Sequence, residues 1–309
     1  MIRFVLRRLL SLVPTLLLAV TLVFFLVRLA PGGPFDQERS VPPEVLAALE
    51  AKYRLSDPVW VQYKDWLADL LLRGSLGPTF KYPNRTVNEI IALSLPVSIQ
   101  LGLWAMLFAL ALGVPLGVVG AMRQNRWPDA LATAIALVGL SVPRFVLAPL
   151  LIMLFGLTLY WLPVARFDSW RHMVLPVFCA ALPMAAHVAR LTRAGMLEVV
   201  RSDFVRTARA KGLSERAVMY GHVFRNAMLP QITGLALSIG TMVGGALVAE
   251  IIFSYPGLGS TILTAVLGQD YPLISATTLI VTLMVLAANF AIEIIYGVLD
   301  PRIKAAQAD

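Results

Sequence analysis

Residues Arg206–Pro230, RTARAKGLSERAVMYGHVFRNAMLP, form a basic and mostly polar stretch in a chain of 309 residues that is 58% hydrophobic. Apolar segments long enough to cross a bilayer lie on either side of this stretch. The mean hydropathy of +0.77 and the 14% of charged residues indicate a membrane protein rather than a soluble domain. The stretch holds no recognisable catalytic constellation, so the question it raises is which partner contacts it.

Six segments qualify as membrane spans, because the bilayer core of ~30 Å requires ~20 mostly apolar residues in a helix. They are Leu9–Leu29, Val97–Met122, Ala130–Phe155, Met173–Leu191, Ile232–Ile252 and Leu273–Leu299. The single cysteine, Cys179, lies inside the fourth, so no intrachain disulfide can form. The first segment follows a basic start, as a signal peptide does, but its apolar run is too long. Arg28 also stands where cleavage after Ala30 would require a small residue, so we interpret the segment as a retained anchor.

The distribution of Lys and Arg predicts the orientation, because cytoplasmic loops carry an excess of both. Basic residues gather at the amino end, at Arg123 and Arg126, in the tail, and in Arg190–Arg225, which has eight Lys and Arg against three acids. An even number of spans places all four groups on one side, so we expect both termini in the cytoplasm. The segment 31–95 balances seven basic against eight acidic residues and is expected outside. The net charge of +8 then follows from topology, without any nucleic-acid interaction.

The outer segment contains two amphipathic patterns, PPEVLAALEAKYRL from Pro42 and DPVWVQYKDWLADLLLRG from Asp57. Each predicts a short helix, and the second is expected to be capped by Asp57, to begin at Pro58 and to stop at Gly74. The two helices would form a small cap at the mouth of the membrane domain. Alternatively they lie on the lipid surface, for which Trp60, Tyr63 and Trp66 are also suited.

Other classes of membrane protein are less well supported. The sequence has no phosphate loop, HExxH, CxxC or GxSxG pattern, and its three histidines are scattered, which counts against a membrane-embedded enzyme. An ion-coupled transporter would require carboxylates near the bilayer centre. At 1.5 Å per residue, Glu250 lies ~27 Å along the fifth span and Glu293 ~30 Å along the sixth. Both positions are close to a rim, which counts against ion coupling.

The quoted stretch predicts a helix of its own. Ser214 can cap a helix from Glu215 to about Met228. Helical spacing places an apolar face on Ala217, Tyr220, Gly221, Phe224, Ala227 and Met228. Gly212 permits a tight turn before this helix, and Pro230 marks the entry to the fifth span. We therefore predict a short helix across the cytoplasmic face, with its turn exposed to a partner's groove; the alternative is a basic loop on lipid headgroups.

The sequence DFVRTARAKGLSERAVMYGHVFRNAMLP closely resembles the cytoplasmic EAA-type signature of bacterial ABC-importer permeases, in the longer form of the dipeptide/oligopeptide/nickel family. The glycine of that signature falls on Gly212, its two alanines on Thr207 and Ala208, and its leading glutamate on Arg206. This departure at Arg206 is usual in the peptide branch. The stretches MIRFVLRRLLSLVPTLLLAVTLVFFLVRLAPGGP, KYRLSDPVWVQYKDWL, GSLGPTF, EIIFSYPGLG and DPRIK resemble the B-type subunit of the same branch.

The resemblance implies an all-α polytopic membrane protein with the ABC importer type I permease fold: six transmembrane helices, a cytoplasmic coupling helix and a small helical periplasmic cap. It also implies the partners, namely a homologous second permease that completes the pore, two cytoplasmic ATPase subunits and an external substrate-binding protein. No catalytic residue, metal or cofactor is expected on this chain, since ATP and Mg would bind to the ATPase subunits. The expected location is the bacterial inner membrane.

The expected organisation is a first span in 1–30, an outer segment in 31–95, a permease core of five spans in 96–299 with the coupling helix around 206–228, and a tail in 300–309. The residues expected to dock into an ATPase are Arg206, Thr207, Ala208, Lys211, Gly212, Leu213, Ser214, Glu215 and Arg216. Three polar residues within spans, Arg144, Glu250 and Asn289, are candidates for the translocation pathway.

Arg144 has two possible roles. It lies ~21 Å along a straight third span, where a charge is costly and should face water or a partner. It either lines the pore and meets a peptide carboxylate, or it folds onto carbonyls freed by Pro143 or pairs with a neighbouring subunit's acid. The expected substrate is a dipeptide or oligopeptide. Nickel, glutathione or another small solute remains an alternative, because binding proteins usually set the choice.

Overall fold

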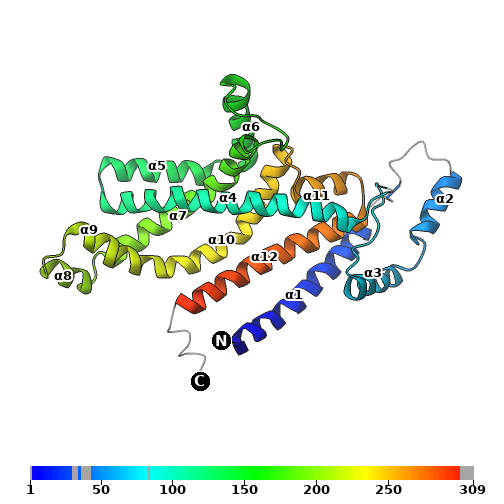
Figure 1. The fold of residues 1–309 in the computed structure, drawn as a ribbon, viewed down its shortest axis with the longest axis horizontal. Coiled ribbons are helices and arrows are strands. Elements are labelled where there is room, and N and C mark those ends of the chain that lie inside the picture. The colour runs from blue at the N-terminus through cyan, green and yellow to red at the C-terminus, as the bar shows by residue number, and fades with distance from the viewer. Residues whose placement is uncertain (1, 30–33, 36–42, 83, 300–309) are drawn as a thin grey trace. The chain divides into compact units, whose positions relative to one another are not determined.

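The computed structural model describes residues 2–29, 34–35, 43–82 and 84–299 (Figure 1). Within these ranges, the side chains of 2–9, 43, 45–47, 229–242, 292–293 and 295–299 are not described, and Glu293 is among them. The expected tail, 300–309, lies outside the described residues. The regular structure in the described ranges is helical, with a single strand-like bridge between Pro78 and Thr86, which confirms the all-α prediction.

The helices follow one another along the whole described chain. In chain order they are α1 (Ile2–Leu29), α2 (Pro43–Lys52), α3 (Val59–Arg73), α4 (Val87–Met122), α5 (Trp127–Ser141), α6 (Arg144–Leu151), the π-helical η1 (Ile152–Thr158), α7 (Arg171–Val199), α8 (Asp203–Ala210), α9 (Glu215–Ala217), the π-helical η2 (Val218–Phe224), α10 (Arg225–Ile252), α11 (Leu258–Leu267) and α12 (Tyr271–Leu299).

Four helices are each long and apolar enough to cross a membrane: α1, α4, α7 and α12. Helix α5 together with α6 and η1 is apolar and long enough as a pair, and its bend is typical of either a broken span or a re-entrant loop. Helix α10 contains the predicted segment Ile232–Ile252 and is helical throughout, but only Val243–Ile252 of its apolar part has described side chains. The count of six spans therefore stays a prediction.

The third predicted span is not one straight helix. Helix α5 ends at Ser141, α6 begins at Arg144, and the two parts are bent by 106°. Val142 is extended, at φ −84° and ψ 115°, because a residue before proline is pushed out of the helical region, and Pro143 has no N–H to continue the helix. A bend at Pro143 is thus confirmed, but the position of Arg144 along a straight helix was wrong, because Arg144 starts a new helix.

Helix α4 begins at Val87, ten residues before the predicted second span, so the expected boundary between 95 and 96 falls inside it. The start is set by a capping box in the sequence TVNE. The Glu89 N–H donates to Thr86 Oγ1, and the Thr86 N–H donates to the Glu89 carboxylate, each at 3.3 Å. This reciprocal pair satisfies backbone donors that an uncapped helix would leave free.

The chain divides into two compact units, of which the first holds residues 1–97 and 256–286. In this unit α3 packs on the C-terminal half of α1: the ring centroids of Phe24 lie 5.2 Å from Tyr63 and 5.4 Å from Trp66, and Thr21 and Tyr63 share a hydrogen bond of 2.7 Å. The contacts of Tyr63 and Trp66 favour a protein-bound cap, while Trp60 on the same helix is 65% exposed.

Of the two predicted ends of α3, the C-terminal one is confirmed and the N-terminal one is wrong. Gly74 ends the helix in the left-handed conformation, at φ 62°, as predicted. The predicted cap is wrong, because the helix begins at Val59 with Pro58 in the capping position and no capping side chain. Asp57 instead pairs with Arg54 at 2.9 Å.

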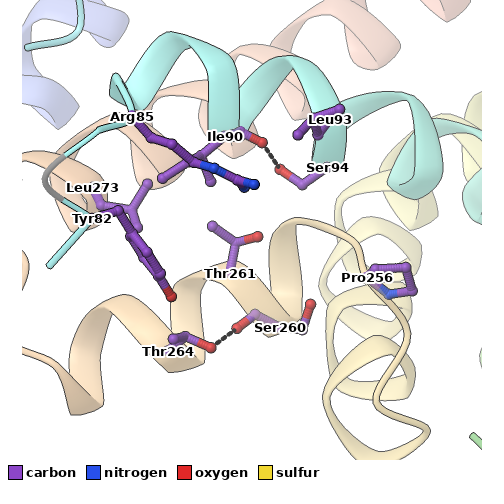
Figure 2. A pocket seen from close by; sticks show the side chains of 10 residues that line it. All are labelled: Tyr82, Arg85, Ile90, Leu93, Ser94, Pro256, Ser260, Thr261, Thr264 and Leu273. Atoms are coloured by element: carbon purple, nitrogen blue, oxygen red, sulfur yellow. Dashed lines mark hydrogen bonds between the residues drawn. The ribbon is translucent and has the colours of Figure 1, made fainter. Parts of the chain in front are cut away.

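The rest of this unit contains a buried carboxylate that joins two segments, and a cavity. The buried carboxylate of Asp270 accepts hydrogen bonds from Thr79 Oγ1 and from the Phe80 N–H, and so holds the loop before α4 to the start of α12. A cavity of about 250 Å³ lies between the beginning of α4 and α11 (Figure 2). Helix α11 was not predicted from the sequence.

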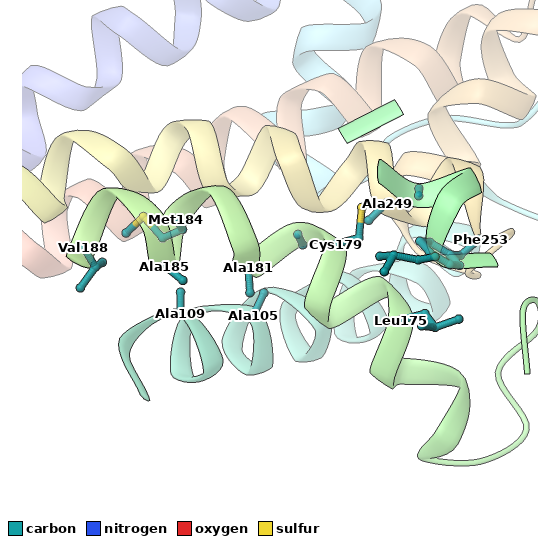
Figure 3. Close-up of a cluster of buried hydrophobic side chains, with 13 residues drawn as sticks. Ala105, Ala109, Leu175, Cys179, Ala181, Met184, Ala185, Val188, Ala249 and Phe253 are labelled. Atoms are coloured by element: carbon teal, nitrogen blue, oxygen red, sulfur yellow. The ribbon is translucent and has the colours of Figure 1, made fainter. Parts of the chain in front are cut away.

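The second unit, residues 98–255 and 287–309, is built around α7. Small residues of α7 face small residues of α4, with Ala181 and Ala185 near Ala105 and Ala109 (Figure 3). A Cβ at Gly117 would lie 2.5 Å from the Ala189 carbonyl oxygen. Gly113 is limited in the same way, by the Ala185 carbonyl oxygen at 2.5 Å, so these two glycines permit close helix approach, which is how helices associate in lipid. At Gly120 the nearest atoms belong instead to the side chains of Arg193 and Asp129, at 3.2 Å.

Candidate functional site

The polar stretch after α7 forms two helical arms joined by a tight turn. Helix α8 begins after Ser202 and ends at Ala210. Gly212 has φ 78°, a left-handed conformation that glycine adopts without strain. Ser214 then caps the second arm, since its Oγ accepts a hydrogen bond from the Ala217 N–H at 3.4 Å. The predicted cap and turn are thereby confirmed, and we call residues 203–224 the coupling hairpin, after the role that the sequence predicts for it.

One side of the coupling hairpin is buried. Val205 and Ala208 come from α8, and Val218, Met219 and Val223 come from η2. They pack with Val118 and Ala121 of α4, Met196 of α7 and Ala227 of α10. This cluster fixes the hairpin to three long helices of its unit, so the turn is presented on a packed support.

The other side of the hairpin is exposed. Of the nine residues predicted to contact an ATPase, eight are exposed: Arg206, Thr207, Lys211, Gly212, Leu213, Ser214, Glu215 and Arg216. Ala208 is the exception, and it belongs to the buried cluster. The exposed set combines cations with the apolar side chain of Leu213, which is 42% exposed. Such a mixture suits a groove that offers both acidic and apolar contacts.

An ion pair closes the base of the turn. Arg209 Nε donates to Glu215 Oε2 at 3.1 Å, and its second terminal nitrogen donates to Oε1 at 2.7 Å. The hydrogen bonds from Arg209 lower the pKa of the Glu215 carboxyl below its ordinary value, and the same bonds raise the pKa of Arg209. Both groups are therefore charged at neutral pH, and the pair links α8 to α9 across the turn.

Two details of the predicted helix were wrong. The buried face uses Val218, Met219 and Val223, whereas three residues of the predicted face are exposed, namely Ala217, Tyr220 and Gly221. Ala227 of the predicted face is buried, as predicted. The reason is η2, whose turns are wider than those of an α-helix, so the 3.6-residue period does not apply. The helix is also not short, because α9, η2 and α10 follow one another without a gap and pass Pro230.

Helix α8 was not predicted from the sequence, although a local signal is present. Ser202 and Asp203 stand at its start, a pattern typical of helix beginnings. Val205 and Ala208 follow at a spacing of three and are the two buried residues of this helix. The apolar pattern covers only two turns and is surrounded by basic and polar residues, so it did not predict a helix.

Arg144 is the first residue of α6 and is partly buried. Its guanidinium lies against Gly245 of α10, where a Cβ would collide with it. The Arg144 Nε is buried and has no hydrogen-bond partner among the described residues. The contact explains why α10 has a glycine at this point.

The other two pathway candidates lie in different surroundings. Glu250 is fully buried near the end of α10, where it interacts electrostatically with the phenol of Tyr255. Asn289 is half-buried on α12. No described contact brings Arg144, Glu250 and Asn289 together, so their place on a translocation pathway stays a prediction.

The coupling hairpin and the apolar helices match a known family of membrane proteins. Residues 113–305 match the model of the Binding-protein-dependent transport system inner membrane component, and residues 1–102 match the model of the N-terminal part of such membrane components. The chain belongs to this family. It is therefore a permease subunit of an ABC importer, a multi-pass inner-membrane protein that works with ATPase subunits and a substrate-binding protein.

Curated relatives resemble the permease over its full length. It is 42% identical over 307 residues to the oligopeptide transport system permease protein OppB of Salmonella typhimurium, which covers 98% of this chain and 100% of that protein. It is 39% identical over 304 residues to the dipeptide transport system permease protein DppB of Bacillus subtilis, with 98% of each chain covered. The family predicted from the sequence motifs is confirmed.

A solved structure shares the fold of the permease. A chain of the MetNI methionine ABC transporter, in inward-facing conformations, superposes with a TM-score of 0.59 at 15% identity. The match covers 68% of this chain and 96% of that chain. This agreement confirms the ABC-importer permease fold.

Proposed function

We propose that the permease forms half of the translocation pore of an ATP-driven importer of dipeptides or oligopeptides. The observation that carries the proposal is the coupling hairpin, in which an exposed, capped turn rests on a buried cluster. The full-length similarity to relatives named as oligopeptide and dipeptide permeases supports the substrate class. Nickel, glutathione or another small solute is the alternative within the same architecture, because the binding protein delivers the substrate.

The partners follow from this role. A homologous second permease completes the pore as a heterodimer, with a homodimer as the alternative arrangement. Two cytoplasmic ATPase subunits bind ATP and Mg, so this chain is not itself an enzyme and needs no cofactor. An external binding protein supplies the peptide. Both termini face the cytoplasm, in agreement with the basic residues of the loops.

The coupling hairpin docks into one ATPase subunit. Arg206, Lys211 and Arg216 supply exposed cations, and Leu213 supplies an apolar contact. Thr207, Gly212 and Ser214 shape the exposed surface, and Glu215 holds Arg209. Ala208 acts through the buried cluster beneath the turn. Arg144, Glu250 and Asn289 are the candidate polar positions of the pathway, and Arg144 is the one whose side chain has a buried unpaired donor.

The test replaces Gly212 and Arg216 in the importer reconstituted with its partners in vesicles. Gly212→Val forces a branched side chain into a left-handed conformation, which costs about 1–2 kcal/mol or more per residue. Arg216→Glu reverses an exposed charge. We expect both variants to assemble but to lose ATP-dependent peptide import and substrate-stimulated ATPase activity.

Matched controls isolate the turn from general effects. Gly74 is also left-handed, and neither glycine has a heavy atom within 4 Å of an added Cβ, so Gly74→Val carries the same strain in the outer segment. Arg123→Glu reverses another exposed charge of a predicted cytoplasmic loop. Normal import by Gly212→Val and Arg216→Glu would contradict the docking role. Import that does not depend on ATP would favour an ion-coupled transporter.

A further inference from the structure

The cavity beside α11 has a polar wall that the coupling role does not use. It lies within the first compact unit, between the start of α4 and α11 (Figure 2). Its polar lining consists of Tyr82, Arg85, Ser94, Ser260, Thr261 and Thr264. Figure 2 shows Arg85 reaching between the two helices, over Thr261. The cavity is in a part of the chain that the sequence predicts to be at the outer side of the membrane.

Four hydroxyl groups of this wall each donate a hydrogen bond to a backbone carbonyl oxygen. Ser260 and Thr261 both donate to the Gly257 carbonyl, at 2.8 and 2.9 Å. Thr264 donates to the Ser260 carbonyl at 2.9 Å, and Ser94 donates to the Ile90 carbonyl at 3.0 Å. A hydroxyl oxygen keeps acceptor capacity after it has donated. The four oxygens therefore offer acceptors to a ligand.

Arg85 supplies hydrogen-bond donors and a positive charge to the same cavity. Its guanidinium carries up to five N–H donors and is always charged. It forms no ion pair with any residue that the structure describes. The cavity thus offers a cation at one position and several acceptors around it, which suits a ligand with both an anionic group and N–H donors.

The volume limits what can enter. Sites for drug-sized ligands measure about 300–1,000 Å³. At about 250 Å³ the cavity holds the end of a chain molecule rather than a whole oligopeptide. A second cavity of about 440 Å³ adjoins it and shares Tyr82, Thr264 and Leu273 as wall residues, which leaves room for the preceding part of the ligand.

We propose that this cavity binds the carboxyl end of the peptide substrate on its way into the pore. The carboxylate pairs with Arg85, and the last peptide N–H groups donate to the oxygens of Thr261 and its neighbours. A phospholipid phosphate would also pair with Arg85, but it carries only acceptors and would leave the acceptor capacity of the hydroxyl oxygens unused. The inference rests on the proposed function, since it requires that peptides are transported.

The first experiment measures binding through protection of a thiol. Leu93 lines the cavity, is 65% exposed and is not part of the polar wall, so Leu93→Cys places a label there. The native Cys179 is fully buried and serves as the unreactive background. Trialanine, up to millimolar concentrations, should slow maleimide labelling of Leu93→Cys in the assembled importer without the binding protein.

The comparison ligand is trialanine amide, which lacks the carboxylate. A hydrogen bond to a charged group contributes about 1.5–3 kcal/mol, and each 1.4 kcal/mol is tenfold in affinity. We therefore expect at least about tenfold weaker protection by the amide. Arg85→Gln should remove the difference between the two peptides, and Arg85→Lys should restore part of it, while Arg73→Gln, which alters another outer arginine, should leave it unchanged.

The second experiment measures import of the same two peptides by the complete importer. The ratio of acid to amide import in Arg85→Gln is compared with that ratio in the unaltered permease, which cancels any preference of the binding protein. A lowered ratio supports the inference. An equal loss of import for both peptides would assign Arg85 to contact with the binding protein and would overturn the inference. An absence of thiol protection would also overturn it. If the unaltered importer transports no peptide, the proposed function itself is wrong.

Discussion

The two partners of the ion pair between Asp129 and Arg193 are unequally buried, which predicts which single substitution lowers the free energy of unfolding more. Arg193 Nε donates to Asp129 Oδ1 at 2.6 Å, and a second guanidinium nitrogen donates to Oδ2 at 2.8 Å. The Asn125 N–H also donates to Oδ2, at 2.9 Å. The pair joins the first turn of α5 to α7.

The two partners differ in their access to water, so removing one is not equivalent to removing the other. The side chain of Asp129 is 6% exposed, and that of Arg193 is 32% exposed. Arg193→Met leaves a buried carboxylate whose remaining donors, the Asn125 N–H and the Thr133 side chain, are uncharged, and breaking a buried pair in this way costs about 3–5 kcal/mol. Asp129→Leu leaves an arginine that can reach water, so we expect a smaller loss of about 1–3 kcal/mol.

The double variant tests whether the cost of Arg193→Met comes from the carboxylate that is left unpaired. A buried ion pair replaced by apolar residues of similar volume is often nearly neutral, so Asp129→Leu with Arg193→Met should be more stable than Arg193→Met alone. The free energy of unfolding is measured by denaturant titration in mixed micelles. Arg73→Met breaks the exposed pair with Asp69 and should cost less than about 0.5 kcal/mol. A double variant less stable than either single variant would refute the argument.

Two further predictions concern α4 and α6. Gly117→Leu pushes α4 away from α7, so we expect a loss of about 1–3 kcal/mol or more in the same titration. Gly102→Leu on the same helix meets nothing within 4 Å and should be tolerated. Arg144→Gln keeps hydrogen bonding without the charge, and if Arg144 lines the pathway, peptide import slows while assembly and basal ATPase activity stay intact. Loss of assembly, or unchanged import, would instead assign Arg144 to packing against Gly245.

The long helices could be predicted because lipid imposes one strong requirement, a continuous apolar run of sufficient length. Five of the six predicted segments each lie within one helix, and the third is divided among α5, α6 and η1. The bend at Pro143 could be predicted for the same local reason, the missing N–H. Its size could not, because the direction of α6 depends on its packing against α7 and α10, which lie far away in the sequence.

The coupling hairpin shows a similar division between local and distant causes. Ser214 and Gly212 act on their nearest neighbours, and both were assigned their observed roles from sequence. The buried face was not, because η2 widens the turn so that Val218 and Met219 reach α4 and α7. That adjustment depends on the partner helices, and the sequence of the hairpin alone does not contain it.

The continuity of α9, η2 and α10 decides what a force on the turn can do. A separate short helix, as the sequence predicted, would join the fifth span through a bend that absorbs part of any displacement. In the structure the helical path from Glu215 to Ile252 has no gap. Pro230, which has no N–H to donate, interrupts the hydrogen-bond ladder within this path, so the helix connects the turn to Gly245, where Arg144 lies, with one position at which it can bend. The coupling and pathway proposals thus concern two ends of one helix. They remain separable, because Gly212→Val strains only the turn, whereas Arg144→Gln alters only the distant contact.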